Sequence, residues 1–368
     1  MKVLVVGAGL SGATMANLLS KDNDVTLLEE SSEIGGNCHD YRDSNGIMVH
    51  KYGSHIFHTS YRDVWDHLLK YTAFNDYRHR VLADIDGINV PIPFNFDSIR
   101  KVFSSDVADD IIDRLSKRYQ HGSRIPITEL LKQDDEVLSD LFDYIYEKVF
   151  LHYTEKQWGV SPEKISPEVI SRAPVSMDDD SHYFRDDHEG IPLDGYTAMI
   201  GRMIDRENIH LRLDTSFKDI DDPDAYDLIF YTGSVDELMD YEYGVLPYRS
   251  VRFEIEEYDK EHYQENSVIN HPNDHDYTRI HEYKYYLGDV SERTVIAREY
   301  PEQYVPGKNR RAYPVRTDES IALYERYKRE AKKRYPNMYF LGRLGDYRYY
   351  DMDDSVKRAI DVHRGVIG

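Results

Sequence analysis

The chain has 368 residues, of which 31% are charged, with a formal net charge of −22 at pH 7 and one cysteine. This length predicts two or three domains, and the acidic balance argues against nucleic acid and anionic membranes as partners. One cysteine excludes a disulfide framework and a cysteine zinc cluster, and no metal is expected. With no leader and no apolar run of about 18 residues, we expect a cytoplasmic protein without membrane insertion.

The first thirty residues carry the pattern of a dinucleotide-binding unit. Lys2 to Val6 is a short, valine-rich apolar run, which indicates a buried parallel strand. The spacing G-x-G-x-x-G follows at Gly7, Gly9 and Gly12. These glycines suit a tight turn, a close approach to a pyrophosphate and close helix packing, and the helix N-terminus favours phosphate. A second apolar run, Val25 to Leu28, ends at Glu29, where an acid can bind a ribose hydroxyl.

A second pair of glycines indicates which dinucleotide is bound. Gly35 and Gly36 suggest that the chain passes close to a bulky group, and a plain nicotinamide dehydrogenase has no use for them. The spacing Glu29-x5-Gly35-Gly36 resembles the FAD-binding signature of the glutathione-reductase and amine-oxidase type flavoproteins. We therefore expect FAD as the cofactor.

The middle of the chain first predicts a hairpin and then helices. Tyr77 to Val90 alternates between apolar and polar residues and turns at Asp86-Gly87, which indicates a hairpin. Phe96 to Trp158 carries apolar residues at helical spacing. Residues 166–189 are loop-like, with prolines at 167 and 174.

The second half of the chain returns to strands. Strands of the parallel-sheet type that lead into glycine turns are predicted at Leu228–Gly233 and Met338–Gly342. Between them, Tyr248 to Tyr300 has a period of two, including a strand over Tyr277–Tyr285, which implies an antiparallel sheet. A helix is predicted over Ile321–Tyr335 and another from Asp353.

These elements predict an α/β fold: a Rossmann-like FAD-binding domain with an inserted helical domain and an antiparallel β-sheet substrate domain. The expected boundaries are 1–76, 190–235 and 317–368 for the FAD-binding domain, 96–165 for the helical domain, and 77–95, 166–189 and 236–316 for the antiparallel sheet and mobile-loop domain.

Four separate segments together resemble the prokaryotic UDP-galactopyranose mutases: His50–Thr59, Tyr153–Gly159, Tyr277–Ile280 and Gly342–Met352. The resemblance implies a non-redox flavoenzyme that interconverts UDP-galactopyranose and UDP-galactofuranose. In that family N5 of reduced FAD attacks C1 of the sugar and displaces UDP, giving a flavin–sugar adduct before ring opening and reclosure. The resemblance also implies an external reductant for the flavin and a homodimer.

The same resemblance implies the substrate-binding residues. Arg172 and Arg279 would hold the pyrophosphate, for which the arginine fork is suited. Tyr349, Tyr313 and Tyr183 would donate hydroxyls to phosphate, with Tyr349 also counted among the catalytic residues. Tyr153 would stack on uracil, and further contacts would come from Thr154, Trp158 and Asn270. His79 stands where some relatives have an asparagine that touches substrate. The loop at 166–189 would close over the bound UDP-sugar.

The resemblance assigns the remaining positions to the cofactor. His55 would lie beside the flavin and influence N5, as a catalytic residue, and Arg343 would stabilise the negative charge of the reduced flavin. The full cofactor set is Gly7, Gly9, Ser11, Gly12, Glu29, Gly35, Gly36, Asn37, His55, Ile56, Gly342, Arg343, Tyr350, Asp351, Met352 and Ser355.

Two alternatives stay open from the sequence. One keeps the chemistry but changes the substrate to another nucleotide hexose, such as UDP-N-acetylgalactosamine. The other is an amine-oxidase-like flavin oxidoreductase, which would consume reductant stoichiometrically, whereas a mutase needs only a catalytic amount.

Overall fold

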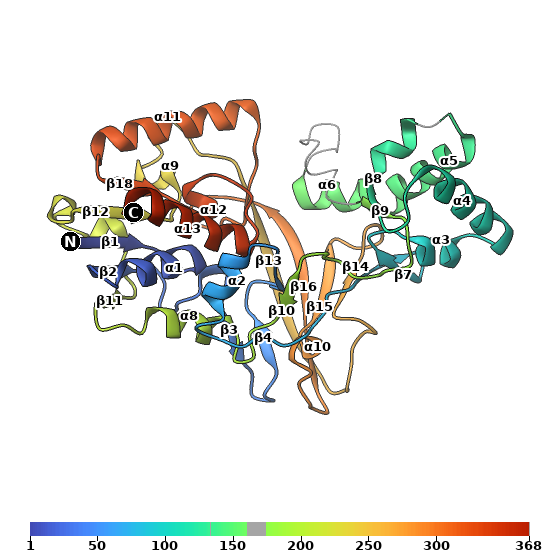
Figure 1. Cartoon of the computed structure of the whole chain (residues 1–368), viewed down its shortest axis with the longest axis horizontal. Helices are drawn as coiled ribbons and strands as arrows, with labels where there is room; N and C mark the ends of the chain where they lie inside the picture. The colour runs from blue at the N-terminus through green and yellow to red at the C-terminus, as the bar shows by residue number, and fades with distance from the viewer. Residues whose placement is uncertain (133, 160–173, 368) are drawn as a thin grey trace.

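The computed structural model describes residues 1–132, 134–159 and 174–367. Figure 1 shows a parallel sheet with its helices at one end, a group of helices at the other, and a large sheet between them. Both chain termini lie at the end that holds the parallel sheet (Figure 1).

The parallel sheet is Rossmann-like, as the sequence predicted. Its order is β11 (Ile209–Arg212), β2 (Asp24–Leu28), β1 (Lys2–Val6), β12 (Leu228–Tyr231) and β18 (Met338–Phe340). All of its neighbouring pairs are parallel. The inner strands β1, β2 and β12 are mostly buried and apolar, since helices cover both faces of the sheet, whereas the edge strand β11 is largely exposed.

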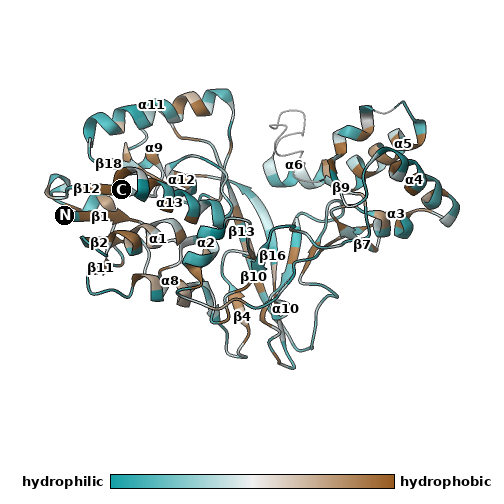
Figure 2. Ribbon diagram, in the orientation of Figure 1, coloured by the Kyte–Doolittle hydropathy of each residue, from teal (hydrophilic) through white to brown (hydrophobic). Residues whose placement is uncertain are grey.

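Alternate residues of β1 serve the two faces of this sheet. Val3 and Val5 pack with α1 (Leu10–Leu19), α8 (Tyr196–Ile204) and α13 (Met352–Val366). Leu4 faces the opposite core, which includes residues of α9 (Val235–Leu238) and α11 (Asp318–Arg334). Figure 2 shows the strands of this sheet and α1 largely hydrophobic, and the outer helix α11 largely hydrophilic.

The large sheet has the order β17 (Tyr313–Pro314), β13 (Tyr248–Tyr258), β16 (Thr294–Gln303), β15 (Arg279–Glu282), β14 (Val268–Asn270), β6 (Val81–Ile85) and β7 (Ile88–Ile92). The predicted hairpin is confirmed as β6–β7. The sheet is antiparallel except between β14 and β6, which run parallel. A parallel pair needs a long connection, and these two strands lie far apart in the sequence.

The strand predicted over Tyr277–Tyr285 is wrong at both ends. The structure has β15 only from Arg279 to Glu282, followed by the short helix α10 (Lys284–Leu287). Tyr283 and Tyr286 are both buried, and their spacing of three places them on one helical face. That tertiary burial overrides the period-two pattern.

The helical group packs on the hairpin rather than standing alone. It comprises α3 (Phe96–Val102), α4 (Ser105–Arg118), α5 (Glu136–Ile145), η3 (Tyr146–Leu151) and α6 (His152–Trp158). Asn95 begins α3 with a capping box, and the Asp135 side chain caps α5. Their apolar faces share one core with Val81, Ile85 and Val90 of the hairpin.

Short elements complete the described chain. Strand pairs are β3 (Asp40–Arg42) with β4 (Met48–His50), β5 (Phe57–Thr59) with β10 (His188–Gly190), and β8 (Arg124–Pro126) with β9 (Pro174–Ser176). Helices are η1 (Gly36–Cys38), α2 (Arg62–Leu68), η2 (Ile127–Lys132), η5 (Phe217–Asp219), η6 (Pro223–Ala225) and α12 (Gly342–Gly345). Within the described ranges, every helix is too short or too polar to cross a membrane.

Candidate active site

The turn from β1 into α1 requires glycine at two of its predicted positions. Gly7 has φ +98° and donates its N–H to the Leu28 carbonyl at 2.7 Å, which ties the turn to β2. A Cβ on Gly12 would lie 1.9 Å from the carbonyl oxygen of Gly7. Helix α1 therefore packs directly against the turn, as the fingerprint predicted.

Two further backbone segments meet the beginning of α1. Gly35 donates its N–H to the Ala8 carbonyl at 3.0 Å, and a Cβ on Gly36 would lie 3.1 Å from Cα of Gly9. From the other side, a Cβ on Gly342 would lie 3.1 Å from Oγ of Ser11. The loops after β1, β2 and β18 thus converge with almost no side chain between them.

This cradle fits a dinucleotide. Gly9 begins α1 without a side-chain cap, so the positive end of the helix is open to phosphate. Glu29 lies at the end of β2, 8% exposed, and accepts from the Ala8 N–H at 2.8 Å and from the Ser31 N–H at 3.1 Å. A carboxylate held in this way can also accept from a ribose hydroxyl.

The other predicted cofactor positions surround the same cradle. Asp351 begins α13 with a capping box, Met352 Sδ lies 3.6 Å from Cys38 Sγ, and Asn37 Oδ1 accepts from Arg310 at 3.3 Å. The Tyr350 hydroxyl donates to Asp346 at 3.2 Å, and the Ser355 carbonyl accepts from Ser11 at 3.5 Å. Ile56 is buried.

His55 is held as a neutral ring. Its Nδ1 lies 2.8 Å from the Gly53 carbonyl, so Nδ1 carries the proton and Nε2 is left as an acceptor. Burial, followed by the neighbouring His50, lowers the pKa of His55 to about 3. At neutral pH this ring can accept a hydrogen bond and carries no charge.

Arg343 joins the cofactor side to the substrate side. Its guanidinium donates to the carbonyls of Ala312 at 3.2 Å and Tyr350 at 2.6 Å. It also lies 5.4 Å from the ring centroid of Tyr313 and 5.3 Å from that of Tyr349, and these two rings are stacked on each other. A fixed positive charge therefore lies between the cradle and the two tyrosines.

Arg279 lies on β15 and is paired with a carboxylate. Its Nε lies 3.3 Å from Oε1 of Glu299, the residue directly opposite on β16, and Nη2 donates to the Tyr153 hydroxyl. Burial opposes the charge of Glu299, but Arg279 and the hydrogen bond from His281 outweigh burial and lower the pKa of Glu299 to about 2. Although burial lowers the pKa of Arg279, the Glu299 carboxylate raises it above its ordinary value.

Tyrosines surround the Arg279 guanidinium. Tyr153, Tyr183 and Tyr313 are all close enough to interact electrostatically with it, and burial raises the pKa of each, so each phenol stays protonated. The Trp158 ring centroid is 6.4 Å from that of Tyr313, and Thr154 is 3% exposed. A guanidinium with hydroxyl donors around it can hold a diphosphate.

Two more predicted substrate residues lie beside this group. Asn270 faces Arg279 across β14 and β15, and its buried Oδ1 has no hydrogen-bond partner in the described part of the chain. His79 packs edge-on against the Tyr183 ring and lies 3.0 Å from the Tyr77 hydroxyl. Burial lowers the pKa of His79 to about 3, so it too is neutral.

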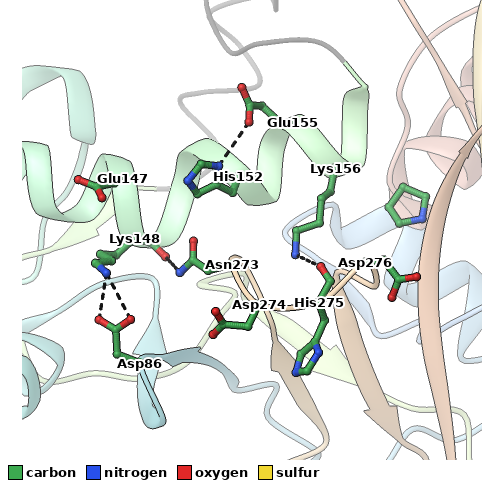
Figure 3. Close-up of a pocket in the computed structure, with 11 residues that line it drawn as sticks. Asp86, Glu147, Lys148, His152, Glu155, Lys156, Asn273, Asp274, His275 and Asp276 are labelled. Carbon is green, nitrogen blue, oxygen red and sulfur yellow. Dashed lines mark hydrogen bonds and ion pairs between the residues drawn. The ribbon is translucent and has the colours of Figure 1, made fainter.

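Helix α6, which carries Tyr153 and Trp158, is fastened to the large sheet from two sides. Arg249 on β13 donates to the carbonyls of Gln157 at 2.9 Å and Lys156 at 3.1 Å. The Lys156 ammonium donates to the carbonyls of His271 and His275, each at 2.7 Å. Figure 3 shows this lysine at the edge of a polar pocket between α6 and the loop at 271–277. The volume of the pocket is about 640 Å³.

The structure thus places together most of the residues that the sequence singled out. Arg172 lies outside the described residues. Sequence reasoning missed Glu299, His281, Ser54 and Lys156. A signal existed for three of them. Arg279 and His281 are two apart on a strand and so share a face, Ser54 lies inside the His50–Thr59 segment, and Lys156 lies inside the Tyr153–Gly159 segment.

A Rossmann-like cradle that fits a dinucleotide, beside a buried arginine surrounded by tyrosines, is the arrangement of a nucleotide-dependent enzyme. Comparison with known proteins identifies which kind. A family model described as UDP-galactopyranose mutase matches residues 148–349, and one described as an NAD(P)-binding Rossmann-like domain matches residues 5–72.

Individual relatives agree with the family model. The chain is 35% identical to the probable UDP-galactopyranose mutase of Klebsiella pneumoniae, over 97% of this chain and 92% of that one. It is 33% identical to a dTDP-fucopyranose mutase of Escherichia coli, over 98% and 97% respectively. A crystal structure of reduced UDP-galactopyranose mutase superposes with a TM-score of 0.75 at 17% identity, covering 100% of this chain and 94% of that one.

The chain therefore belongs to the UDP-galactopyranose mutase family. The predictions of the family, of an isomerase and of FAD as the cofactor are confirmed.

Proposed function

We propose that the protein interconverts UDP-galactopyranose and UDP-galactofuranose without net oxidation or reduction. The observation that carries this proposal is the group around Arg279: a buried guanidinium with the hydroxyl-bearing side chains of Tyr153, Tyr183 and Tyr313, next to a dinucleotide cradle. Such a group can keep the diphosphate bound while the bond between it and C1 of the sugar breaks and later re-forms.

Local charge makes this site compatible with an anionic substrate, although the chain has a net charge of −22. At an effective dielectric constant of about 20, a unit charge pair about 4 Å apart gains roughly 4 kcal/mol. Salt screens the distant surface carboxylates over about 8–10 Å. Because Glu299 offsets the charge of Arg279, the local excess of positive charge comes from Arg343 beside the cradle, and Arg172 is proposed as the second arginine at the diphosphate.

The glycine cradle and Glu29 would hold FAD, which in its reduced form would supply a nucleophilic nitrogen for the anomeric carbon of the sugar. The chain's own residues orient the substrate and neutralise the negative charge of its diphosphate. Arg279 and the tyrosines hold the departing diphosphate, and Arg343 places positive charge beside the cofactor cradle. His55, neutral and with Nε2 free to accept, suits a hydrogen-bonding role beside the ring.

The test is chromatography of UDP-galactopyranose incubated with the purified protein, with and without dithionite. We expect conversion to UDP-galactofuranose only after reduction, with reductant needed in catalytic amount. Arg279→Lys should lose at least about tenfold in kcat/KM, because lysine cannot reproduce the fork contacts. Arg252→Lys, at an exposed position on β13 of the same sheet, is the matched control. Stoichiometric consumption of reductant would instead support an oxidoreductase.

A second nucleotide sugar is a specific alternative. One relative that matches nearly the whole chain is described as a dTDP-fucopyranose mutase. His79, neutral and packed on Tyr183, stands where some relatives have an asparagine that touches substrate, so recognition of the sugar or base can differ here. Parallel assays with dTDP-fucopyranose and UDP-N-acetylgalactosamine at equal concentration separate these substrates by kcat/KM.

We further propose that an external electron donor keeps the flavin reduced and that two copies of the chain form a homodimer. Sedimentation equilibrium of the FAD-loaded protein tests the second point, because a single species of 43.2 kDa would contradict it.

A further inference from the structure

His281 contacts the same carboxylate, that of Glu299, as the proposed diphosphate-binding arginine, Arg279. It follows Arg279 by two positions on β15, so the two side chains point to the same face of the sheet. Across the strand pair, Glu299 stands opposite Arg279, and its carboxylate reaches diagonally to His281. His281 is 2% exposed and Glu299 4%, so neither side chain depends on solvent for its hydrogen bonds.

His281 donates one hydrogen bond and accepts another, and the charge of Glu299 decides which ring nitrogen does which. Because Glu299 is ionised, it can only accept, so His281 Nε2 carries the proton and donates to Oε2 at 3.0 Å. Nδ1 is then an acceptor, and the Ser54 hydroxyl donates to it at 2.5 Å. Ser54 in turn accepts from the Tyr286 hydroxyl. Burial, only partly offset by Glu299, lowers the pKa of His281, in agreement with a neutral ring.

The two oxygens of the Glu299 carboxylate contact different residues. Oε1 accepts from the Thr278 hydroxyl at 3.2 Å and faces Arg279 Nε at 3.3 Å. Oε2 is bound by His281 alone among the described residues. Without that bond the carboxylate could rotate about its terminal torsion, since such torsions are broad, and the Arg279 guanidinium would lose its fixed partner.

Ser54, which bonds to His281, lies in the loop that also carries the proposed cofactor residue His55. Ser54 immediately precedes His55 in sequence. Gly53, on its other side, has φ +83°, and a Cβ there would lie 2.6 Å from the Phe253 ring on β13, so the loop is packed closely against the large sheet. One continuous chain of hydrogen bonds therefore runs from the loop that carries His55 to the partner of Arg279.

We propose that His281 is a positioning residue: it fixes the Glu299 carboxylate and, through it, the orientation in which Arg279 meets the diphosphate. The inference rests on the proposed function of Arg279. It does not place His281 in contact with the substrate. The hydroxyl of Ser54 supports this role by holding Nδ1 as the acceptor, while the contact that acts on Arg279 is the one between Nε2 and Glu299.

Two substitutions separate the two nitrogens of the ring. In His281→Gln the side-chain amide NH2 reaches the place of Nε2 and can still donate to Glu299, while the bond to Ser54 is lost. In His281→Asn the amide reaches only the place of Nδ1, so Glu299 loses its donor. The probes are UDP and dTDP, titrated into the FAD-loaded protein, with FAD content and thermal midpoint checking that each variant folds.

We expect His281→Asn to raise the Kd of the nucleotide that the wild type binds by about tenfold, the low end for a lost hydrogen bond to a charged group. His281→Gln and Ser54→Ala should stay within about threefold. In a Glu299→Gln background, His281→Asn should have almost no further effect, since the residue through which it acts is altered.

Equal losses in His281→Asn and His281→Gln, or an undiminished loss in the Glu299→Gln background, would overturn the role of His281 and leave the proposed function intact. A folded, FAD-loaded wild type that binds neither nucleotide would overturn both.

Discussion

Arg279 and Glu299 form a cross-strand ion pair in the interior of the large sheet, with Nε 3.3 Å from the nearer carboxylate oxygen. The pair keeps the guanidinium charged and oriented, and it leaves Nη2 on the side of Tyr153. A buried pair of this kind is costly to break from one side, because the remaining charge then has no compensating partner. The site therefore has a fixed cation whose position depends on a carboxylate that does not itself meet the substrate.

This pair predicts how the stability of the fold responds to acid. The pKa of Glu299 falls from 4.5 to about 2 on folding, so its contribution is complete above pH 4.5 and is lost as the pH falls toward 2. We expect the difference in free energy of unfolding between wild type and Glu299→Gln to shrink by about 2 kcal/mol from pH 5 to pH 3. Urea unfolding at both pH values measures this difference.

Glu302→Gln is the matched control, since Glu302 lies on the same strand β16 but pairs with the exposed Arg252. Its difference from wild type should stay constant within about 0.5 kcal/mol, as for an exposed pair. If Glu299→Gln behaved like Glu302→Gln, the carboxylate would not be ionised in the folded interior.

The glycine cradle predicts a loss of cofactor from a single methyl group. In Gly12→Ala the new Cβ would start 1.9 Å from the Gly7 carbonyl oxygen, so α1 must move away from the turn. We expect the FAD content, measured as flavin absorbance per protein, to fall by roughly tenfold or more, because the helix N-terminus would no longer face the phosphates.

Gly201→Ala separates this steric effect from a general effect of replacing a helical glycine. Gly201 lies inside α8, and a Cβ there would meet only Ile34 Cδ1 at 3.8 Å, an ordinary contact. That variant should keep its FAD and gain about 0.5–1 kcal/mol in stability. A Gly12→Ala protein with full FAD content would show that the turn can relax.

The parts of the fold with strong local signals could be predicted from sequence. The strand from Lys2 to Val6 and the glycines after it form a contiguous pattern in which turn, helix and strand need particular residues. The hairpin at Asp86-Gly87 was equally clear, because Asp-Gly suits a tight turn between alternating strands.

What sequence reasoning could not supply was pairing between distant segments. No sequence feature near Val81 predicts that β6 will pair in parallel with β14, whose Val268 is the partner of Val81. Likewise, the sequence does not distinguish Glu299 from the many other acidic residues, and only the strand register places it opposite Arg279. Tyr283 and Tyr286 fit a strand or a helix equally well, and only their shared burial decides for α10.

Lys156 gives the last prediction, because it links the two walls of the proposed substrate site. Its ammonium donates to the carbonyls of His271 and His275, in the loop that connects Asn270 to Arg279, while its own helix carries Tyr153. Lys156→Met keeps the length of the side chain but removes every donor. We expect the Kd for UDP to rise by about tenfold, because the hydrogen bonds of a charged group to three carbonyls, those of His271, His275 and Tyr277, hold that loop in place.

Lys148→Met is the control, since Lys148 lies in the preceding turn η3, borders the same pocket and pairs with Asp86 instead of the loop (Figure 3). An exposed pair of that kind contributes little, so its Kd for UDP should stay within about twofold of the wild type. Isothermal titration of both FAD-loaded variants gives the comparison. Equal affinities for UDP in the two variants would mean that the loop at 271–277 keeps Arg279 in place without α6, and that the walls of the site are independent.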